Sequence, residues 1–137
     1  MDKVHTAVVC YEDRESSIIG LKLLALSITR YSPKLPIFVY TSEALITAKL
    51  TDWFERHAPK ACLLPAPQNA PAGWSMKPHV LMDALDRYCD VAIWLDADLM
   101  LNGPIEPRFA GLPTATISVA SETGRANPMR ATIWGFN

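Results

Sequence analysis

Short apolar runs alternate along this chain with longer segments in which apolar residues recur every three or four positions. The short runs are rich in β-branched and aromatic residues and are bounded by turn residues, a pattern typical of buried strands. The predicted strands cover residues 4–10, 37–40, 61–64, 91–95 and 114–120.

The longer segments predict three helices, each preceded by a serine able to cap its first turn. Ser16 or Ser17 is expected to cap the first helix, Ser42 the second and Ser75 the third. Residues 65–73 contain three prolines and a glycine and are expected to form a loop. The side chains expected to face the core are Ile18, Leu21, Ala25 and Ile28, then Ile46, Leu50, Trp53 and Phe54, and finally Leu81, Ala84, Leu85 and Tyr88.

This alternation of strand and helix predicts an α/β fold with a mainly parallel, Rossmann-like sheet flanked by helices. Right-handed crossovers bring the N-terminus of every helix near the carboxyl edge of such a sheet. Ligands of open α/β sheets bind along the same edge. We therefore expect the functional residues to follow the strands or to begin the helices.

Composition and charge narrow the class of protein. The 137 residues, half apolar and a fifth charged, suit one packed domain. A net charge of -1 argues against a nucleic-acid-binding or polybasic membrane-binding protein. The sequence lacks the apolar core of a signal peptide and any run long enough to span a membrane, so we expect a cytoplasmic protein. Residues 131–137 resemble the start of a strand, so we expect the chain to be the front part of a longer domain.

The cysteines and histidines do not indicate a metal site. Cys10, Cys62 and Cys89 form no CxxC pair, which favours reduced thiols and no zinc site. The three histidines have no acid or cysteine spaced for metal binding and are interpreted as structural or surface residues; they are His5, His57 and His79.

Two aspartates follow the most strand-like run of the chain. On an extended backbone Asp96 and Asp98 would point the same way, with only Ala97 between them, although a turn starting at Ala97 would change the angle. Two carboxylates this close repel each other unless a proton or cation lies between them. A hard divalent cation, Mn²⁺ or Mg²⁺, suits their oxygen atoms, with waters and a substrate phosphate completing its shell.

Two further groups are expected at the same edge. Lys77 lies in the first turn of the third predicted helix, where a lysine and the helix N-terminus together suit a diphosphate. The first strand ends in a polar loop that could contact a base or a ribose, comprising Cys10, Tyr11, Glu12, Asp13 and Arg14. A polar loop that only caps the first helix is the alternative interpretation of these residues.

The sequence resembles a glycosyltransferase of the GT-A fold, closest to the family 8 type that uses nucleotide-sugar donors. The resemblance runs from Thr6 to Phe109, through TAVVCYED, IIGLKLLALSITRYSP and PIFVYTSE to WSMKPHVLMDALDRYCDVAIWLDADLMLNGPIEPRF. In the last segment lysine, helix, strand and Asp-x-Asp come in the family's order. The closing Gly135-Phe136-Asn137 resembles the start of the family's Phe-Asn-x-Gly segment.

The resemblance implies transfer of a sugar, with retention of configuration, from a nucleoside-diphosphate donor to an acceptor hydroxyl. It implies Mn²⁺ held by Asp96 and Asp98, with Lys77 on donor phosphate or sugar, and a donor that is usually a UDP-sugar. A third metal ligand, commonly histidine, is expected beyond Asn137, so we expect the 137 residues alone to bind donor weakly and to turn over nothing. The donor-binding residues implied are Cys10, Tyr11, Glu12, Lys77, Asp96, Ala97, Asp98 and Asn137.

The sequence departs from the family's pattern in its base-binding loop, and other classes of protein remain possible. The family's base-binding loop usually carries small hydroxyl or amide residues, whereas Cys10, Tyr11 and Glu12 stand here, which leaves the base open. A sugar nucleotidyltransferase would carry a glycine-rich loop where CYEDRE stands, and a haloacid-type phosphatase would continue its Asp-x-Asp into Gly-Thr rather than Leu99-Met100. A degenerate module that binds nucleotide-sugar without transferring it is the non-enzyme alternative.

Overall fold

A computed structural model describes residues 2–111 of the chain. The strand predicted at residues 114–120, the segment 131–137 and the candidate site residue Asn137 lie outside these residues. The residues up to Pro107 form one compact unit. Within residues 2–111 no helix has both the length and the hydropathy needed to cross a bilayer.

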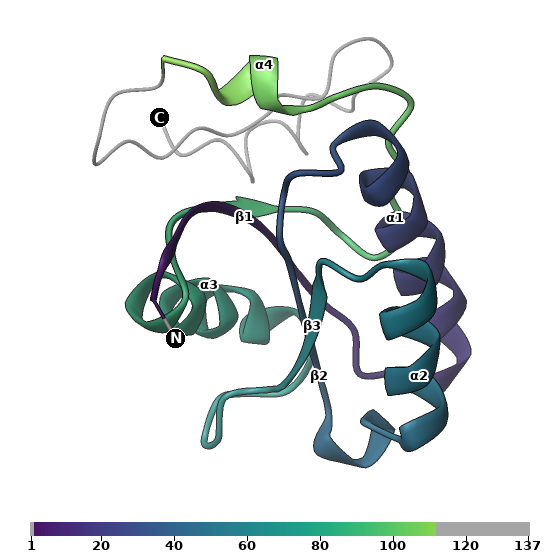
Figure 1. The fold of residues 1–137 in the computed structure, drawn as a ribbon. Helices are drawn as coiled ribbons and strands as arrows, with labels where there is room; N and C mark the ends of the chain where they lie inside the picture. Colours follow the sequence, from purple (N-terminus) through teal and green to yellow (C-terminus); the bar gives the residue numbers. More distant parts are fainter. Residues whose placement is uncertain (1, 112–137) are drawn as a thin grey trace, which may run out of the picture. The chain divides into compact units, whose positions relative to one another are not determined.

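Four parallel strands form the sheet of this unit (Figure 1). Their order across the sheet is β3-β2-β1-β4, so β1 pairs with β2 on one side and with β4 on the other. All four lie close to the predicted positions. Their bounds are β1 Val4–Tyr11, β2 Ile37–Thr41, β3 Ala61–Pro65 and β4 Cys89–Trp94.

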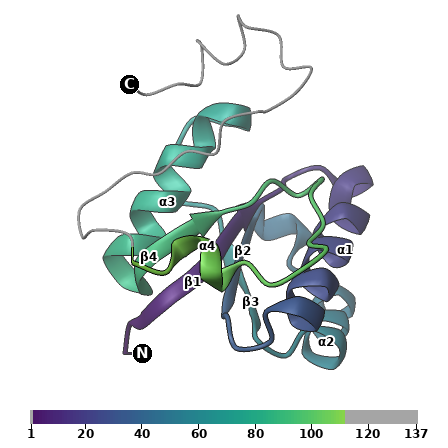
Figure 2. The same ribbon diagram turned by 90° about the horizontal axis from the view of Figure 1, so that it is seen from above.

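Helices cover both faces of the sheet. Figures 1 and 2 show α1 (Ile18–Tyr31) and α2 (Ala48–His57) side by side on one face and α3 (Met76–Arg87) on the other. The predicted α/β architecture with a parallel sheet between helices is therefore confirmed. Short 3-10 turns at Glu15–Ser17, Glu43–Leu45 and Gly73–Ser75 precede the three helices, and α4 covers Glu106–Phe109.

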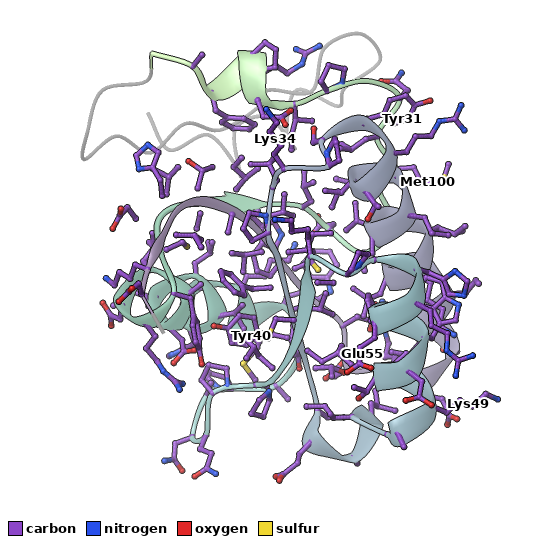
Figure 3. All side chains as sticks on the ribbon, in the orientation of Figure 1. Tyr31, Lys34, Tyr40, Lys49, Glu55 and Met100 are labelled. Atoms are coloured by element: carbon purple, nitrogen blue, oxygen red, sulfur yellow. The ribbon has the colours of Figure 1, made fainter. Side chains whose placement is uncertain are left out.

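The core under α3 follows from the alternation of side chains along the strands. Residues two apart on β1 and β2 point to the same face, and they meet a stripe of residues four apart on α3. Tyr40, one of the labelled side chains in Figure 3, also contributes a polar contact. Its hydroxyl donates a hydrogen bond to Asp83 Oδ2 at 2.7 Å, which joins β2 to α3. The buried cluster includes Ala7, Val9, Phe38, Tyr40, Met76, Val80 and Ala84.

The cap predicted for α2 is wrong, and the core face predicted for α3 is only partly right. Ser42 begins the short turn Glu43–Leu45, and Ile46, with ψ at 76°, interrupts the helical path. The cap of α2 is Thr47, whose hydroxyl accepts a hydrogen bond from the Leu50 N–H at 3.2 Å. On α3 the fully buried residues are Met76, Val80 and Ala84, of which Ala84 was predicted to face the core. Leu81 and Tyr88 are partly buried against the same core, as predicted, whereas Leu85 is 38% exposed.

The capping serines of α1 and α3 stand at the predicted positions without the predicted bonds. Ser17 and Ser75 occupy the N-cap positions, but neither side chain accepts a hydrogen bond from the helix it precedes. In both cases a 3-10 turn leads into the helix, and its backbone hydrogen bonds take over part of the role of a cap. All three cysteines are free, Cys10 and Cys89 buried and Cys62 exposed.

Candidate functional site

The candidate site follows from the order of the strands. Strands β1, β2 and β3 follow one another in one direction across the sheet, whereas β4 lies on the other side of β1. The direction of winding therefore reverses between β1 and β4, and ligands of open α/β sheets bind at the carboxyl ends of the two strands at such a point. The register pairs Val9 with Trp94, so the segment after Tyr11 and the segment after Trp94 leave the sheet as neighbours. These are the two segments that the sequence singled out.

Asp96 is held from two neighbouring elements. Lys77 Nζ, from the first turn of α3, lies 2.5 Å from Asp96 Oδ1. The indole N–H of Trp94, at the end of β4, donates to the same oxygen at 2.8 Å. Partial burial raises the pKa of Asp96, but the hydrogen bonds from Lys77 and Trp94 outweigh it, and the pKa is lowered. The expectation that Lys77 and Asp96 meet at the carboxyl edge is thus confirmed.

Asp98 lies in a turn and is exposed. The Leu99 N–H donates to the Asp96 carbonyl at 3.0 Å, which closes a turn over residues 96–99. The backbone is therefore not extended at this point, and the two carboxylates leave it in a turn rather than from one face of a strand. The charge of Asp98 also acts on Arg14. The pKa of Arg14 is raised mainly by its hydrogen bond to Glu12, and the negative charge of Asp98 adds to this effect.

The loop after β1 is organised around the buried carboxylate of Glu12. Glu12 is 6% exposed, and its Oε1 accepts the N–H groups of Asp13 and Arg14 at 3.1 and 3.0 Å. The guanidinium of Arg14 adds two bonds, from Nε to Oε1 at 2.8 Å and from Nη2 to Oε2 at 2.7 Å. The hydrogen bond from the Arg14 side chain is the main reason that the pKa of Glu12 is lowered. The Glu12 side chain therefore shapes the loop, and a donor base would have to meet the backbone or the neighbours of Glu12.

The other two predicted base-binding residues differ in access. Cys10 is buried, with its thiol 3.9 Å from the Phe38 carbonyl, and burial raises its pKa to about 12. Tyr11 is half-buried and donates from its hydroxyl to Asp13 Oδ2 at 2.9 Å. Burial, with help from Asp13, raises the pKa of Tyr11 to about 12. Tyr11 and Asp13 thus present a fixed pair of polar groups at the end of β1.

Tryptophans surround Lys77. Its Nζ lies 5.5 Å from the ring centre of Trp94 and 5.7 Å from that of Trp74. Trp74, in the turn that precedes α3, is 77% exposed, and Gly73 before it has a φ of 73°. The ammonium group of Lys77 therefore contacts one carboxylate and two aromatic rings at the N-terminus of α3.

The sequence analysis missed two small residues of α1, Gly20 and Ser27, and Ser32, which directly follows the helix. Gly20 leaves room for the Ala97 carbonyl, and the Ser27 hydroxyl accepts the Leu101 N–H at 3.0 Å. At the end of the helix Ser32, fully buried, accepts the Ile105 N–H at 3.2 Å and donates to Glu106 Oε2 at 2.6 Å. Residues 97–106 therefore run along α1, and we call them the strap (Figures 1 and 2). The strap begins within the turn of residues 96–99, which we call the aspartate turn.

The residues at this edge offer oxygen ligands to a hard cation. In the described part of the chain no three His, Cys, Asp or Glu side chains come together as a metal site. The carboxylates that follow β4 are those of Asp96 and Asp98. Oδ1 of Asp96 already accepts from Lys77 and Trp94, which leaves Oδ2 and the exposed Asp98 carboxylate for a cation. A pair of carboxylate oxygens fits Mn²⁺ or Mg²⁺ when phosphate and water complete the shell.

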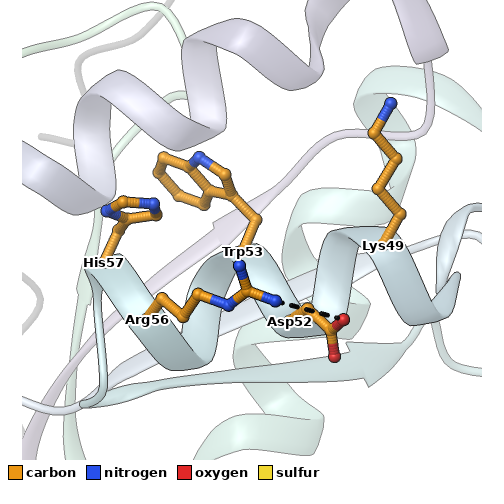
Figure 4. A pocket seen from close by; sticks show the side chains of 5 residues that line it. All are labelled: Lys49, Asp52, Trp53, Arg56 and His57. Atoms are coloured by element: carbon orange, nitrogen blue, oxygen red, sulfur yellow. Dashed lines mark ion pairs between the residues drawn. The ribbon is translucent and has the colours of Figure 1, made fainter.

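A shallow hollow elsewhere on the unit contains none of these residues. It lies on α2, where Trp53 and His57 stack at 5.0 Å between ring centres and Arg56 pairs with Asp52 at 3.7 Å (Figure 4). The surface ion pair is worth little in water. The remaining lining residue is Lys49.

Neither the family models nor the curated proteins give an assignment for the site. The chain matches no model of a protein family, and a search of curated proteins finds no significant match. The arrangement at the ends of β1 and β4 must therefore carry the functional argument on its own.

Proposed function

We propose that this chain binds a nucleoside-diphosphate sugar through a divalent cation at Asp96 and Asp98 and serves glycosyl transfer to an acceptor hydroxyl. One observation carries the proposal: Lys77 Nζ lies 2.5 Å from Asp96 Oδ1 at the N-terminus of α3, where the winding of the sheet reverses. A cationic side chain, a helix N-terminus and two carboxylates combine the groups that a diphosphate and its cation require.

The roles of the residues follow from their charges. When bound, Mn²⁺ would act as a Lewis acid that stabilises negative charge on the leaving nucleoside diphosphate. Asp96 and Asp98 would hold it, while Lys77 and the N–H groups at the start of α3 would face the diphosphate oxygens. In transfer, the bond from the anomeric carbon to the diphosphate breaks, a bond to the acceptor oxygen forms, and the proton of the acceptor hydroxyl passes to an oxygen of the departing diphosphate. The nucleoside base of the donor would contact Tyr11, Asp13 and the backbone beside them.

The cation-dependent part of this proposal is tested by calorimetry of UDP binding to the 137-residue chain. We expect UDP to bind at least about tenfold more tightly with Mn²⁺ than with EDTA, and Asp98→Asn to remove that difference. Asp90→Asn is the matched control, because Asp90 is an exposed aspartate at the opposite end of β4. Equal UDP affinity with and without Mn²⁺, or an unaltered Mn²⁺ effect in Asp98→Asn, would refute the cation-held donor.

Hydrolysis of a UDP-sugar separates an enzyme from a binding module. In the presence of Mn²⁺, release of UDP from a panel of UDP-sugars is expected to depend on Asp98, as UDP binding does. Because the 137 residues alone are expected to turn over nothing, this assay uses a longer chain that also carries the expected third metal ligand. Binding without hydrolysis by that chain would favour the degenerate module over the transferase.

A further inference from the structure

The aspartate turn rests on α1 at a position where there is no side chain. A Cβ atom built on Gly20 would lie 2.5 Å from the Ala97 carbonyl oxygen and 3.4 Å from its carbon. The first distance is shorter than real Cβ contacts allow, and the neighbour is backbone, which cannot rotate away as the end of a side chain could. To reach ordinary van der Waals separation, the carbonyl would have to move by about 1 Å.

The contact at Gly20 bears directly on Asp98. The Ala97 carbonyl belongs to the peptide unit that joins Ala97 to Asp98, and Asp98 N itself lies 4.0 Å from the position of the added Cβ. A shift of this unit therefore moves the Asp98 backbone, whereas Asp96 is held separately by Lys77 and Trp94. The distance between the two carboxylates is thus sensitive to what stands at position 20.

The rest of the strap restrains the turn from the other side. The Leu101 N–H bonds to Ser27 of α1 and the Ile105 N–H bonds to Ser32, just after the helix, so the chain beyond the turn is tied to α1 and to its C-terminal end. A displaced turn is consequently held between Lys77 at one end and Ser27 at the other. The turn cannot move away from α1 without losing one of these bonds or changing its own conformation.

We propose that Gly20 is a positioning residue that sets the separation of the Asp96 and Asp98 carboxylates and so the affinity for the cation–diphosphate unit. This inference rests on the proposed function, because it assigns to Gly20 the geometry of the same cation site. Gly20 touches neither donor nor cation in this assignment; it acts through the Ala97 carbonyl. A displacement of this size in a positioning element can cost a site a large factor in affinity or rate.

The test compares Gly20→Ala with Ile19→Ala in the 137-residue chain. Ile19 is the adjacent α1 residue and is 63% exposed, so its replacement keeps the strap contacts. Free hydrated Mn²⁺ is followed by electron paramagnetic resonance in the presence of UDP, and stability is followed by urea unfolding. Alanine is the better helix former, so helix propensity alone would leave the urea midpoint unchanged or higher. We expect about tenfold weaker Mn²⁺ binding in Gly20→Ala and unaltered binding in Ile19→Ala.

The backbone amide signals of residues 96–99 provide a readout that needs no ligand. They should shift in Gly20→Ala and stay in place in Ile19→Ala. If wild-type chain binds no Mn²⁺ with UDP while these signals shift, the proposed function fails and with it the effect on affinity, and only the effect of Gly20 on the geometry of the turn stands. If wild-type chain binds Mn²⁺ and Gly20→Ala binds it equally well, the positioning role is refuted and the proposed function stands.

Ser27→Ala keeps the proposal testable if Gly20→Ala does not fold. This variant removes the acceptor of the Leu101 N–H without adding bulk beside Ala97. We expect about threefold weaker Mn²⁺ binding, because the turn loses its restraint on one side only. Unaltered Mn²⁺ binding and unaltered amide signals for residues 96–99 in Ser27→Ala would overturn the role given to the strap.

Discussion

Lys77 Nζ and Asp96 Oδ1 are 2.5 Å apart and join the start of α3 to the end of β4. Trp94 donates to the same oxygen, so two donors converge on one side of the carboxylate. Both side chains remain partly accessible, 33% for Lys77 and 48% for Asp96. The pair therefore lies where an incoming cation and an incoming anion would each compete for one of its members.

Replacing Lys77 by methionine should change cation and nucleotide affinity in opposite directions. Without nucleotide, Lys77→Met should bind Mn²⁺ about 3- to 10-fold more tightly, because a second cation beside Asp96 no longer repels the metal. With saturating Mn²⁺, it should bind UDP about tenfold more weakly, because the diphosphate loses a charged partner. Calorimetry of both titrations measures the two effects.

Lys49→Met is the control for a general loss of positive charge, since Lys49 is exposed on α2 and remote from the pair. It should leave both affinities within about twofold of wild type. Weaker Mn²⁺ binding in Lys77→Met would show that Lys77 supports the cation site rather than competing with it.

Ser32, which directly follows α1, should be more costly to remove than Ser17, which directly precedes it. Its buried hydroxyl holds both the Ile105 N–H and the Glu106 carboxylate, and Ser32→Ala would leave these groups without their partner. We expect a loss of about 2–3 kcal/mol in the free energy of unfolding, measured by urea denaturation. Ser17→Ala is the control, because Ser17 makes no capping bond, and its loss should stay below about 0.5 kcal/mol. Equal losses in the two variants would contradict the role of Ser32.

The sheet and the edge of the site could be predicted because both depend on local patterns. Apolar runs such as Val4–Tyr11 determine a buried strand, and the meeting of Lys77 with Asp96 follows from the handedness of parallel crossovers. The helix details were less accessible. Whether Ser42 or Thr47 caps α2 depends on the dihedral angles of Ile46, which the residue type does not determine.

The contacts of the strap could not be predicted because they join residues about 75 positions apart. A glycine or a serine on a helix is compatible with a solvent-exposed face, and only the path of residues 97–106 gives Gly20, Ser27 and Ser32 their partners. The same limit applies to Glu12, whose carboxylate could have faced a ligand. The turn of the backbone toward Arg14 directs it into the loop instead.

Glu12 should make the stability of the chain depend on pH in the acidic range. Its pKa in the folded chain is lowered from an ordinary value of 4.5, chiefly by the Arg14 side chain. Its stabilising contribution is therefore fully present above about pH 4.5 and is lost as the pH falls through the lower, folded-state pKa. Glu12→Gln removes the titrating group but keeps the size of the side chain, so the gap in unfolding free energy between it and wild type should be largest near neutral pH.

Urea unfolding of the two proteins at a series of pH values down to about 3 measures that gap. It should narrow steadily below pH 4.5, because protonated Glu12 no longer accepts these hydrogen bonds as a negatively charged group and loses its ion pair with Arg14. Asp13→Asn is the matched control on the same loop: it removes an acidic group that bonds to Tyr11 rather than to Arg14. A difference in unfolding free energy between wild type and Glu12→Gln that stays constant with pH would mean that the charge of the Glu12 carboxylate does not stabilise the loop.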